Sequence, residues 1–256
     1  MSFLKVQDIH HTYFTKTSAT TALSEISLQV EEGEFVSFLG PSGCGKTTLL
    51  SIISSLLRPT QGTVLLENKP ISTTKNRIGY MLQQDYLFPW KTIEENILLG
   101  LKLSKQLNDK TRSTALALLE QIGLRGVEKQ LPKQLSGGMR QRAALVRTLA
   151  TEPKLLMLDE PFSALDYQTK LKLEDLVSRT LKEFGKTAIL VTHDIGEAIA
   201  MSDRVFLFSS SPGRIHQAFH IPEELRRLSP LAARNHEKYS KLFQTIWKEL
   251  ESLESG

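Results

Sequence analysis

The segment that most constrains the fold is GPSGCGKT, at residues 40–47. It follows a short apolar run at 35–39 and precedes an amphipathic stretch at 47–57, so it joins a predicted strand to a predicted helix. Glycines let backbone N–H groups turn toward phosphate oxygens, and the positive end of the following helix attracts the same anion. The segment therefore predicts a nucleotide-binding loop in an α/β fold.

Within this loop, Lys46 is expected to reach the β- and γ-phosphates of the nucleotide, and the Thr47 hydroxyl is expected to ligate Mg²⁺. Thr48, the residue after Thr47, is also predicted to bind the nucleotide. The complete set from this segment is Gly40, Pro41, Ser42, Gly43, Cys44, Gly45, Lys46, Thr47 and Thr48.

Short apolar runs alternate with amphipathic stretches along much of the chain, which is the rhythm of βαβ units around a mostly parallel sheet. Between about residues 84 and 150 the apolar spacing is helical throughout, which predicts an inserted helical subdomain. We therefore expect one domain with an α/β core at 1–83 and 151–222, a helical subdomain at 84–150 and a C-terminal helical extension at 223–256. Strands are predicted at 26–30, 35–39, 63–67, 77–83, 155–159, 187–193 and 204–209, and helices at 47–57, 93–103, 109–122, 137–150 and 234–254.

Composition excludes several classes of protein. The single cysteine, Cys44, rules out an internal disulfide and a multi-cysteine zinc site. Lys and Arg (32) nearly balance Asp and Glu (28), and the charges are interleaved, so no basic stripe for nucleic acid is apparent. No signal-peptide-like N-terminus and no apolar run of about 18 residues occur, so we expect a cytoplasmic chain that does not cross the membrane itself.

Two carboxylates follow an apolar strand in the segment LLMLDE, at residues 155–160. Such a strand could hold Asp159 beside a bound Mg²⁺ and leave Glu160 to orient or polarise an attacking water. An ordinary strand that ends in a solvated acidic turn would have the same sequence. The phosphate loop earlier in the chain favours the catalytic interpretation.

The string LSGG, at residues 135–138, precedes a predicted helix, so Ser136 and the amides of Gly137 and Gly138 form a candidate anion site. A serine that merely caps the helix is the alternative. The order of phosphate loop, LSGG and acidic strand is what favours function. With these motifs, residues 1 to about 215 resemble the ATP-binding subunit of an ABC transporter.

The resemblance implies a P-loop NTPase core of RecA-like type with an antiparallel β subdomain and an inserted helical subdomain. It implies ATP and Mg²⁺ as cofactors and further site residues. Tyr13 matches the aromatic residue that stacks on adenine, although a plain strand-edge tyrosine is possible. Gln83 matches the glutamine that contacts Mg²⁺ and water, with Gln84 as the rival. His193 matches the histidine that contacts the γ-phosphate, although a strand-end histidine can be merely solvated.

The same resemblance implies a homodimer. The loop SALD, at residues 163–166, matches one that crosses a dimer interface and includes Asp166. In the family, the phosphate loop of one subunit faces the LSGG of the other, and two ATP molecules join the subunits. Two positions depart from the family pattern: Met139 replaces a glutamine, and Gly196 stands where a charged residue usually begins a helix.

A transport function implies permease subunits as partners and an extracytoplasmic solute-binding protein that acts through them. This chain would then lie at the cytoplasmic face of the membrane. Segment 85–90, DYLFPW, matches the region that docks the permease, unless Phe88 and Trp90 pack inside the helical subdomain. Segments 87–90 and 211–215 resemble importers of nitrate, sulfonates, taurine, bicarbonate or thiamine precursors. The alternatives are a non-transport ABC ATPase acting on nucleic acid or ribosomes, and a P-loop kinase; we expect no nucleic-acid partner.

Overall fold

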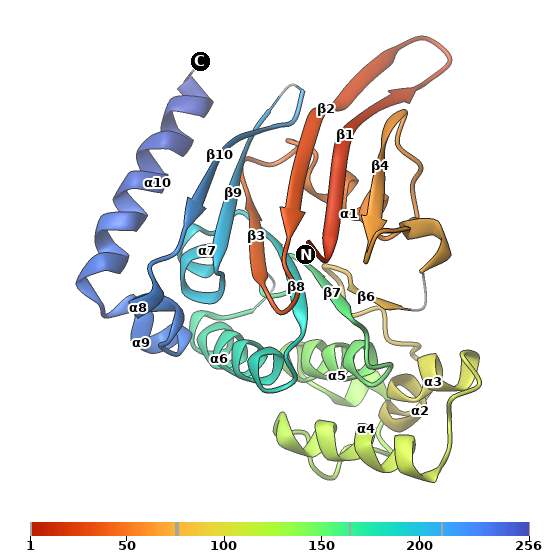
Figure 1. Cartoon of the computed structure of the whole chain (residues 1–256). Coiled ribbons are helices and arrows are strands. Elements are labelled where there is room, and N and C mark those ends of the chain that lie inside the picture. Colours follow the sequence, from red (N-terminus) through yellow and green to blue (C-terminus); the bar gives the residue numbers. More distant parts are fainter. Residues whose placement is uncertain (1, 75–76, 164, 211, 256) are drawn as a thin grey trace.

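The computed structural model describes residues 2–74, 77–163, 165–210 and 212–255. Ala164 and Ser211, which belong to segments singled out above, lie outside the described residues. Two β-sheets lie side by side, helices α2–α5 gather below them, and α10 runs along the opposite side of the molecule (Figure 1).

Within the described residues, one sheet has the strand order β2-β1-β4-β5 and the other has the order β10-β9-β3-β8-β7-β6. The first sheet is antiparallel. In the second sheet neighbouring strands are parallel, except that β10 runs antiparallel to β9. The strands are β1 Leu4–Phe14, β2 Ala19–Val30, β3 Phe35–Leu39, β4 Gln61–Leu66, β5 Lys69–Pro70, β6 Ile78–Met81, β7 Leu155–Asp159, β8 Thr187–Thr192, β9 Arg204–Ser209 and β10 Arg214–His220.

The antiparallel sheet was predicted only in part, because β1 and the first half of β2 were missed. Asp8 and Glu25 have positive φ angles of 47° and 58°, and the pairing of β1 with β2 shifts register between Val6 and Ile9. Such bulges break the alternation of apolar and polar residues by which a half-buried strand is recognised. The irregular pattern of residues 4–14 therefore conceals a continuous strand.

Helices α2–α5 occupy the stretch where helical spacing was predicted, and they share one apolar core with β7 and α6. The long α6 was not among the predicted helices because its buried face includes the polar residues Glu174, Ser178 and Thr180. The helices of this region are α2 Ile93–Ile97, α3 Leu99–Leu103, α4 Asp109–Gln121, α5 Gly137–Leu149 and α6 Tyr167–Glu183.

The remaining helices are α1 Lys46–Ile53, which follows β3, and α7 Ile195–Met201, which follows β8. The C-terminal residues form α8 Glu223–Arg226, α9 Pro230–Arg234 and α10 Glu237–Ser255. Ile246 of α10 and Ala233 of α9 are fully buried in a core with α7 and β9. These helices therefore pack against the same domain as the parallel sheet. In the part of the chain that the structure describes, no helix is both long and apolar enough to cross a membrane.

Candidate functional site

The predicted site residues gather at the carboxyl ends of the parallel strands. Gly40 follows β3, Asp159 ends β7, and His193 follows β8, with Gln83 two residues beyond β6. Parallel strands place these ends at one edge of the sheet, which is where open α/β sheets bind ligands. The topology thus brings together residues that are far apart in the sequence.

The phosphate loop connects β3 to α1 through glycines in the left-handed region, with φ angles of 81° at Gly43 and 92° at Gly45. A Cβ at Gly45 would lie 2.6 Å from Leu23 Cδ2, so this turn leaves no room for a side chain. Lys46 is 5% exposed, and its Nζ donates hydrogen bonds to the carbonyl oxygens of Gly40 (2.7 Å) and Pro41 (2.9 Å). The ammonium group is therefore held in the middle of the loop, where a phosphate could replace these acceptors.

Thr47 and Asp159, two of the predicted Mg²⁺ ligands, contact each other directly. The Thr47 hydroxyl donates to Asp159 Oδ1 (3.1 Å), and the Tyr80 hydroxyl donates to Asp159 Oδ2 (3.1 Å). Burial raises the pKa of Asp159 while these two hydrogen bonds lower it. Hydroxyl and carboxylate oxygens are ligands that Mg²⁺ accepts, and Mg²⁺ commonly takes only one or two protein ligands beside substrate phosphates. The residues present therefore fit that ion.

Glu160 lies at the centre of a second polar group. Its Oε1 is 3.3 Å from His193 Nδ1, and its Oε2 accepts a 3.1 Å hydrogen bond from Gln83 Nε2. The backbone of Glu160 has a φ of 46°, which is uncommon for a glutamate and typical of a constrained functional position. Gln83 and Gln84 are both exposed, and Gln83 is the one whose amide reaches this carboxylate.

Gln141 of α5 is a buried residue that the sequence analysis missed. Its Nε2 donates to the backbone oxygens of Pro161 (2.7 Å) and Gln83 (3.4 Å). It thus holds two backbone segments that carry Gln83 and Glu160. Nothing in the local sequence pattern around Gln141 indicates these two contacts.

Tyr13 extends from β1 toward the start of α1. Its hydroxyl is within hydrogen-bond distance of Thr48 Oγ1 (3.2 Å), and its ring packs edge-on against His11 with ring centroids 4.6 Å apart. The side chain is 45% exposed, so a ring face remains accessible next to the phosphate loop. This position is compatible with stacking on a nucleotide base.

Ser136 caps α5, and its Oγ accepts a 3.4 Å hydrogen bond from the amide of Met139. A Cβ at Gly138 would lie 2.9 Å from Thr169 Cγ2, so this glycine lets α5 approach the start of α6, which Asp166 caps. The hydrogen bonds that we find for Ser136 and Gly138 are made within α5. Within the described part of one chain, the structure therefore places LSGG beside α6 and shows no hydrogen bond from it to the phosphate loop.

Met139, the first departure from the family pattern, packs against the apolar core of the helical region. The segment that follows Gln83 is tied to the same helix. Arg140 Nε donates to Asp85 Oδ2 (2.9 Å), and Arg147 donates to the backbone oxygens of Asp85 and Tyr86 (each 2.7 Å). These hydrogen bonds tie residues 85 and 86 to α5.

The aromatic residues of this segment face outward. Trp90 is 71% exposed and Phe88 36% exposed, and their rings meet edge to face with centroids 5.5 Å apart. Buried Asn96 fixes the backbone of Phe88, accepting from its amide (2.7 Å) and donating to its carbonyl (3.2 Å). The alternative that Phe88 and Trp90 pack inside the helical subdomain is wrong, since Leu87 is the residue that does so.

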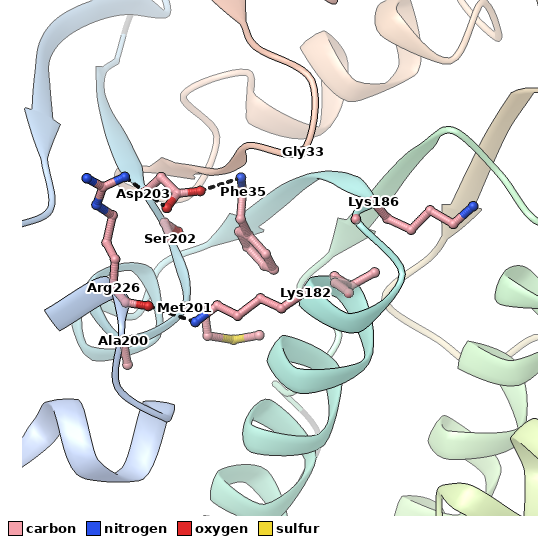
Figure 2. Close-up of a pocket in the computed structure, with 11 residues that line it drawn as sticks. Gly33, Phe35, Lys182, Lys186, Ala200, Met201, Ser202, Asp203 and Arg226 are labelled. Atoms are coloured by element: carbon pink, nitrogen blue, oxygen red, sulfur yellow. Dashed lines mark hydrogen bonds and ion pairs between the residues drawn. The ribbon is translucent and has the colours of Figure 1, made fainter. Parts of the chain in front are cut away.

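A cavity of about 190 Å³ lies at the opposite edge of the parallel sheet (Figure 2). Phe35 at the beginning of β3 and Asp203 just before β9 line it, together with Lys182 and Arg226. Because this is the amino edge of the strands, the cavity is separate from the residues described above.

Comparison with known proteins identifies the family. Residues 23–163 match the family model described as ABC transporter. The chain is 63% identical over 254 residues to the uncharacterized ABC transporter ATP-binding protein YtlC of Bacillus subtilis, covering 99% of this chain and 98% of that protein. It is 42% identical over 194 residues to the taurine import ATP-binding protein TauB of Yersinia pestis, covering 76% of each.

A solved structure, a dimeric ATP-binding cassette in a post-hydrolysis state bound to ADP and phosphate, superimposes with a TM-score of 0.77 at 32% identity. The match covers 86% of this chain and 99% of that one. This confirms the predicted fold class, a P-loop NTPase of the ABC type. The chain therefore belongs to the ATP-binding proteins of ABC transporters, and it is an ATP-hydrolysing enzyme.

Proposed function

We propose that this chain is the ATPase subunit of an ABC importer and that it powers uptake of a small solute of the taurine or sulfonate type through separate permease subunits. The observation that carries the ATPase role is the meeting of Lys46, the Thr47–Asp159 pair and the Glu160 group at one edge of the sheet, and the likeness to taurine and sulfonate import ATP-binding proteins supports import. These are the parts that phosphoryl transfer to water needs: phosphate contacts, a metal site and a group that orients the water.

In the proposed reaction, Lys46 and the amides of residues 40–47 bind the β- and γ-phosphates of ATP. Thr47, Asp159 and Gln83 would hold Mg²⁺, and the ion would neutralise part of the phosphate charge. Glu160 orients the attacking water and accepts its proton. His193, beside Glu160, contacts the γ-phosphate, and Tyr13 stacks on adenine.

The position of Ser136, Gly137 and Gly138 supports a head-to-tail homodimer. These residues form exposed or half-exposed groups at the start of α5, and among the described residues their hydrogen bonds are made within α5 and not to the phosphate loop. A second copy could bring its own loop to them, with Asp166 at the same interface. The dimeric state of the similar solved cassette agrees with this arrangement.

The exposed aromatic residues of segment 86–90 support a permease partner. Trp90, Phe88 and Tyr86 lie together on one segment, and large exposed apolar groups of this kind are typical of interaction sites. Arg147 and Arg140 link the segment to α5, and Gln83 lies immediately before it, so docking here would be coupled to the catalytic group. The chain would then lie at the cytoplasmic face of the membrane, acting with an extracytoplasmic solute-binding protein through the permease.

The test is co-purification of the tagged full chain from detergent-solubilised native membranes, with mass spectrometry of the captured proteins. We expect a multi-spanning permease, lost in Trp90→Ala and retained in Trp247→Ala, which removes a similarly exposed tryptophan from α10. A permease captured equally by both variants would contradict docking at residues 86–90. Capture of ribosomes or DNA-bound proteins without a permease would contradict transport.

A further inference from the structure

A network of charged side chains connects the C-terminal helices to the turn that contains His193. Arg234, at the end of α9, places Nη2 2.6 Å from Oε2 of Glu174 on α6, whose side chain is fully buried. One turn earlier on α6, Lys170 pairs with Asp194 (2.7 Å) and Glu197 (2.5 Å), which flank the start of α7. Buried charges are stable only with partners, so these elements depend on one another.

Both neighbours of His193 in the sequence are held by this network. The Thr192 hydroxyl hydrogen bonds with the buried Glu197 carboxylate and accepts a 3.0 Å hydrogen bond from the amide of Asp194. Asp194 Oδ1 in turn caps α7, accepting from the amides of Gly196 (2.6 Å) and Glu197 (3.1 Å). Since residues 192 and 194 are fixed, the network sets where the backbone presents the imidazole of His193.

The C-terminal helix α10 contacts the same turn through Tyr239. A Cβ at Gly196 would lie 2.8 Å from the Tyr239 hydroxyl oxygen and 3.0 Å from Asp194 Oδ1. Gly196, the second departure from the family pattern, thus provides the space that Tyr239 occupies. Alanine is otherwise the better residue in a helix, so the glycine is explained by this contact and not by helix propensity.

The other end of α7 is also fastened to the C-terminal residues, at the cavity shown in Figure 2. Lys182 Nζ donates to the carbonyl oxygen of Arg226 (2.9 Å), and Nη1 of Arg226 lies 3.5 Å from Oδ1 of Asp203. Both cations lie where α6 and α7 end, and helix carboxyl ends favour positive charge. Lys182 and Arg226 are therefore engaged within the protein, and they attach the extension to α6 and to the turn after α7.

We infer that α9 and α10 position His193 for ATP hydrolysis, with Arg234 and Tyr239 as positioning residues that act through Glu174, Lys170 and Asp194. The inference rests on the role proposed above for His193. On this view the two contacts made by Arg234 and Tyr239 link the C-terminal helices to hydrolysis, and a disturbance at the Gly196–Tyr239 contact alters the turnover of bound ATP more than the binding of ATP.

The test compares Gly196→Ala, the double variant Gly196→Ala/Tyr239→Phe and the wild-type chain in steady-state ATP hydrolysis. We expect Gly196→Ala to lower kcat at least tenfold with less than a twofold change in KM for ATP. The phenylalanine keeps the ring and removes the hydroxyl next to the new methyl group, so the double variant should recover most of the lost kcat. Lys238→Met, which removes an ion pair confined to the C-terminal helices, should leave kcat unchanged.

A wild-type kcat in Gly196→Ala, or a loss that Tyr239→Phe does not restore, would overturn the inference. If Gly196→Ala does not fold, Arg234→Met decides, with a lowered kcat at unchanged KM expected and a wild-type kcat contradicting the inference. The His193→Ala variant distinguishes a failure of the proposed role of His193 from a failure of its positioning by α9 and α10. Normal hydrolysis in that variant would remove the proposed role of His193 itself, whereas inactive His193→Ala beside normal Gly196→Ala would remove only the positioning by α9 and α10.

Discussion

Nδ1 of His193 lies 3.3 Å from Oε1 of Glu160, across the gap between the ends of two neighbouring parallel strands, β8 and β7. Gln83 donates to the other oxygen of the same carboxylate, so both oxygens of Glu160 are engaged. The strained backbone of Glu160 is further held by a 2.9 Å hydrogen bond from its amide to the carbonyl of Val191. These contacts therefore hold the carboxylate at the edge of the sheet where the phosphate loop lies.

The first prediction concerns this carboxylate. Glu160→Gln preserves the size of the side chain and removes its ability to accept a proton, so kcat for ATP hydrolysis should fall by about 10²- to 10⁴-fold. ATP binding should persist, and the variant should accumulate as an ATP-dependent dimer on size exclusion. Glu237→Gln, at an exposed position on α10, is the control. Unchanged hydrolysis in Glu160→Gln would contradict the role given to Glu160.

The second prediction concerns Lys46. Its ammonium group makes hydrogen bonds of 2.7 and 2.9 Å inside the loop and would make charge-assisted ones to phosphate. Lys46→Ala should weaken ATP binding by about 1.5–3 kcal/mol, or roughly tenfold to a hundredfold, measured by titration calorimetry. Lys172→Ala, which removes an exposed lysine from α6, should bind ATP normally. Wild-type affinity in Lys46→Ala would exclude the proposed phosphate contact.

The sequence predicted the bounds of β3, β7 and β9 because each is a short, mostly buried apolar run between turn signals. Parallel topology brings the ends of such strands to one edge, and the structure places Asp159, Gln83 and His193 there, although the resemblance to the family, not the strand pattern, singled out Gln83 and His193. The sequence could not predict partners from other elements. Tyr80, Gln141 and Tyr239 are polar residues on regular elements, and nothing in their local pattern indicates the groups that they contact.

The third prediction concerns the metal. Asp159→Asn removes the charge that would hold Mg²⁺ and keeps the shape of the side chain; the amide oxygen can accept from one of the two hydroxyls that now donate to the carboxylate, those of Thr47 and Tyr80, and the amide nitrogen can donate to the other. Hydrolysis should then require at least about tenfold more Mg²⁺ for its half-maximal rate. Mutating a residue that only hydrogen-bonds to a metal ligand already weakens metal binding or activity by about this factor. The rate is measured across a Mg²⁺ titration, with EDTA abolishing it in the wild-type chain. Asp175→Asn, on the more exposed side of α6, is the control; an identical Mg²⁺ dependence in Asp159→Asn would rule out Asp159 as a ligand.

The last prediction concerns pH and Glu174. Burial raises its pKa to about 7 from 4.5, against the attraction of Arg234 and Lys170 and with the repulsion of Glu197. The folded chain thus binds more protons than the unfolded chain between those two pKa values, so the free energy of unfolding should decrease as pH rises through that range. Glu174→Gln removes the titrating group and should reduce this decrease by about 3 kcal/mol. Urea denaturation from pH 4.5 to 8 measures it, with the exposed Glu183→Gln on the same helix as control. An equal pH dependence in Glu174→Gln and the wild-type chain would show that Glu174 is ionised over the whole range.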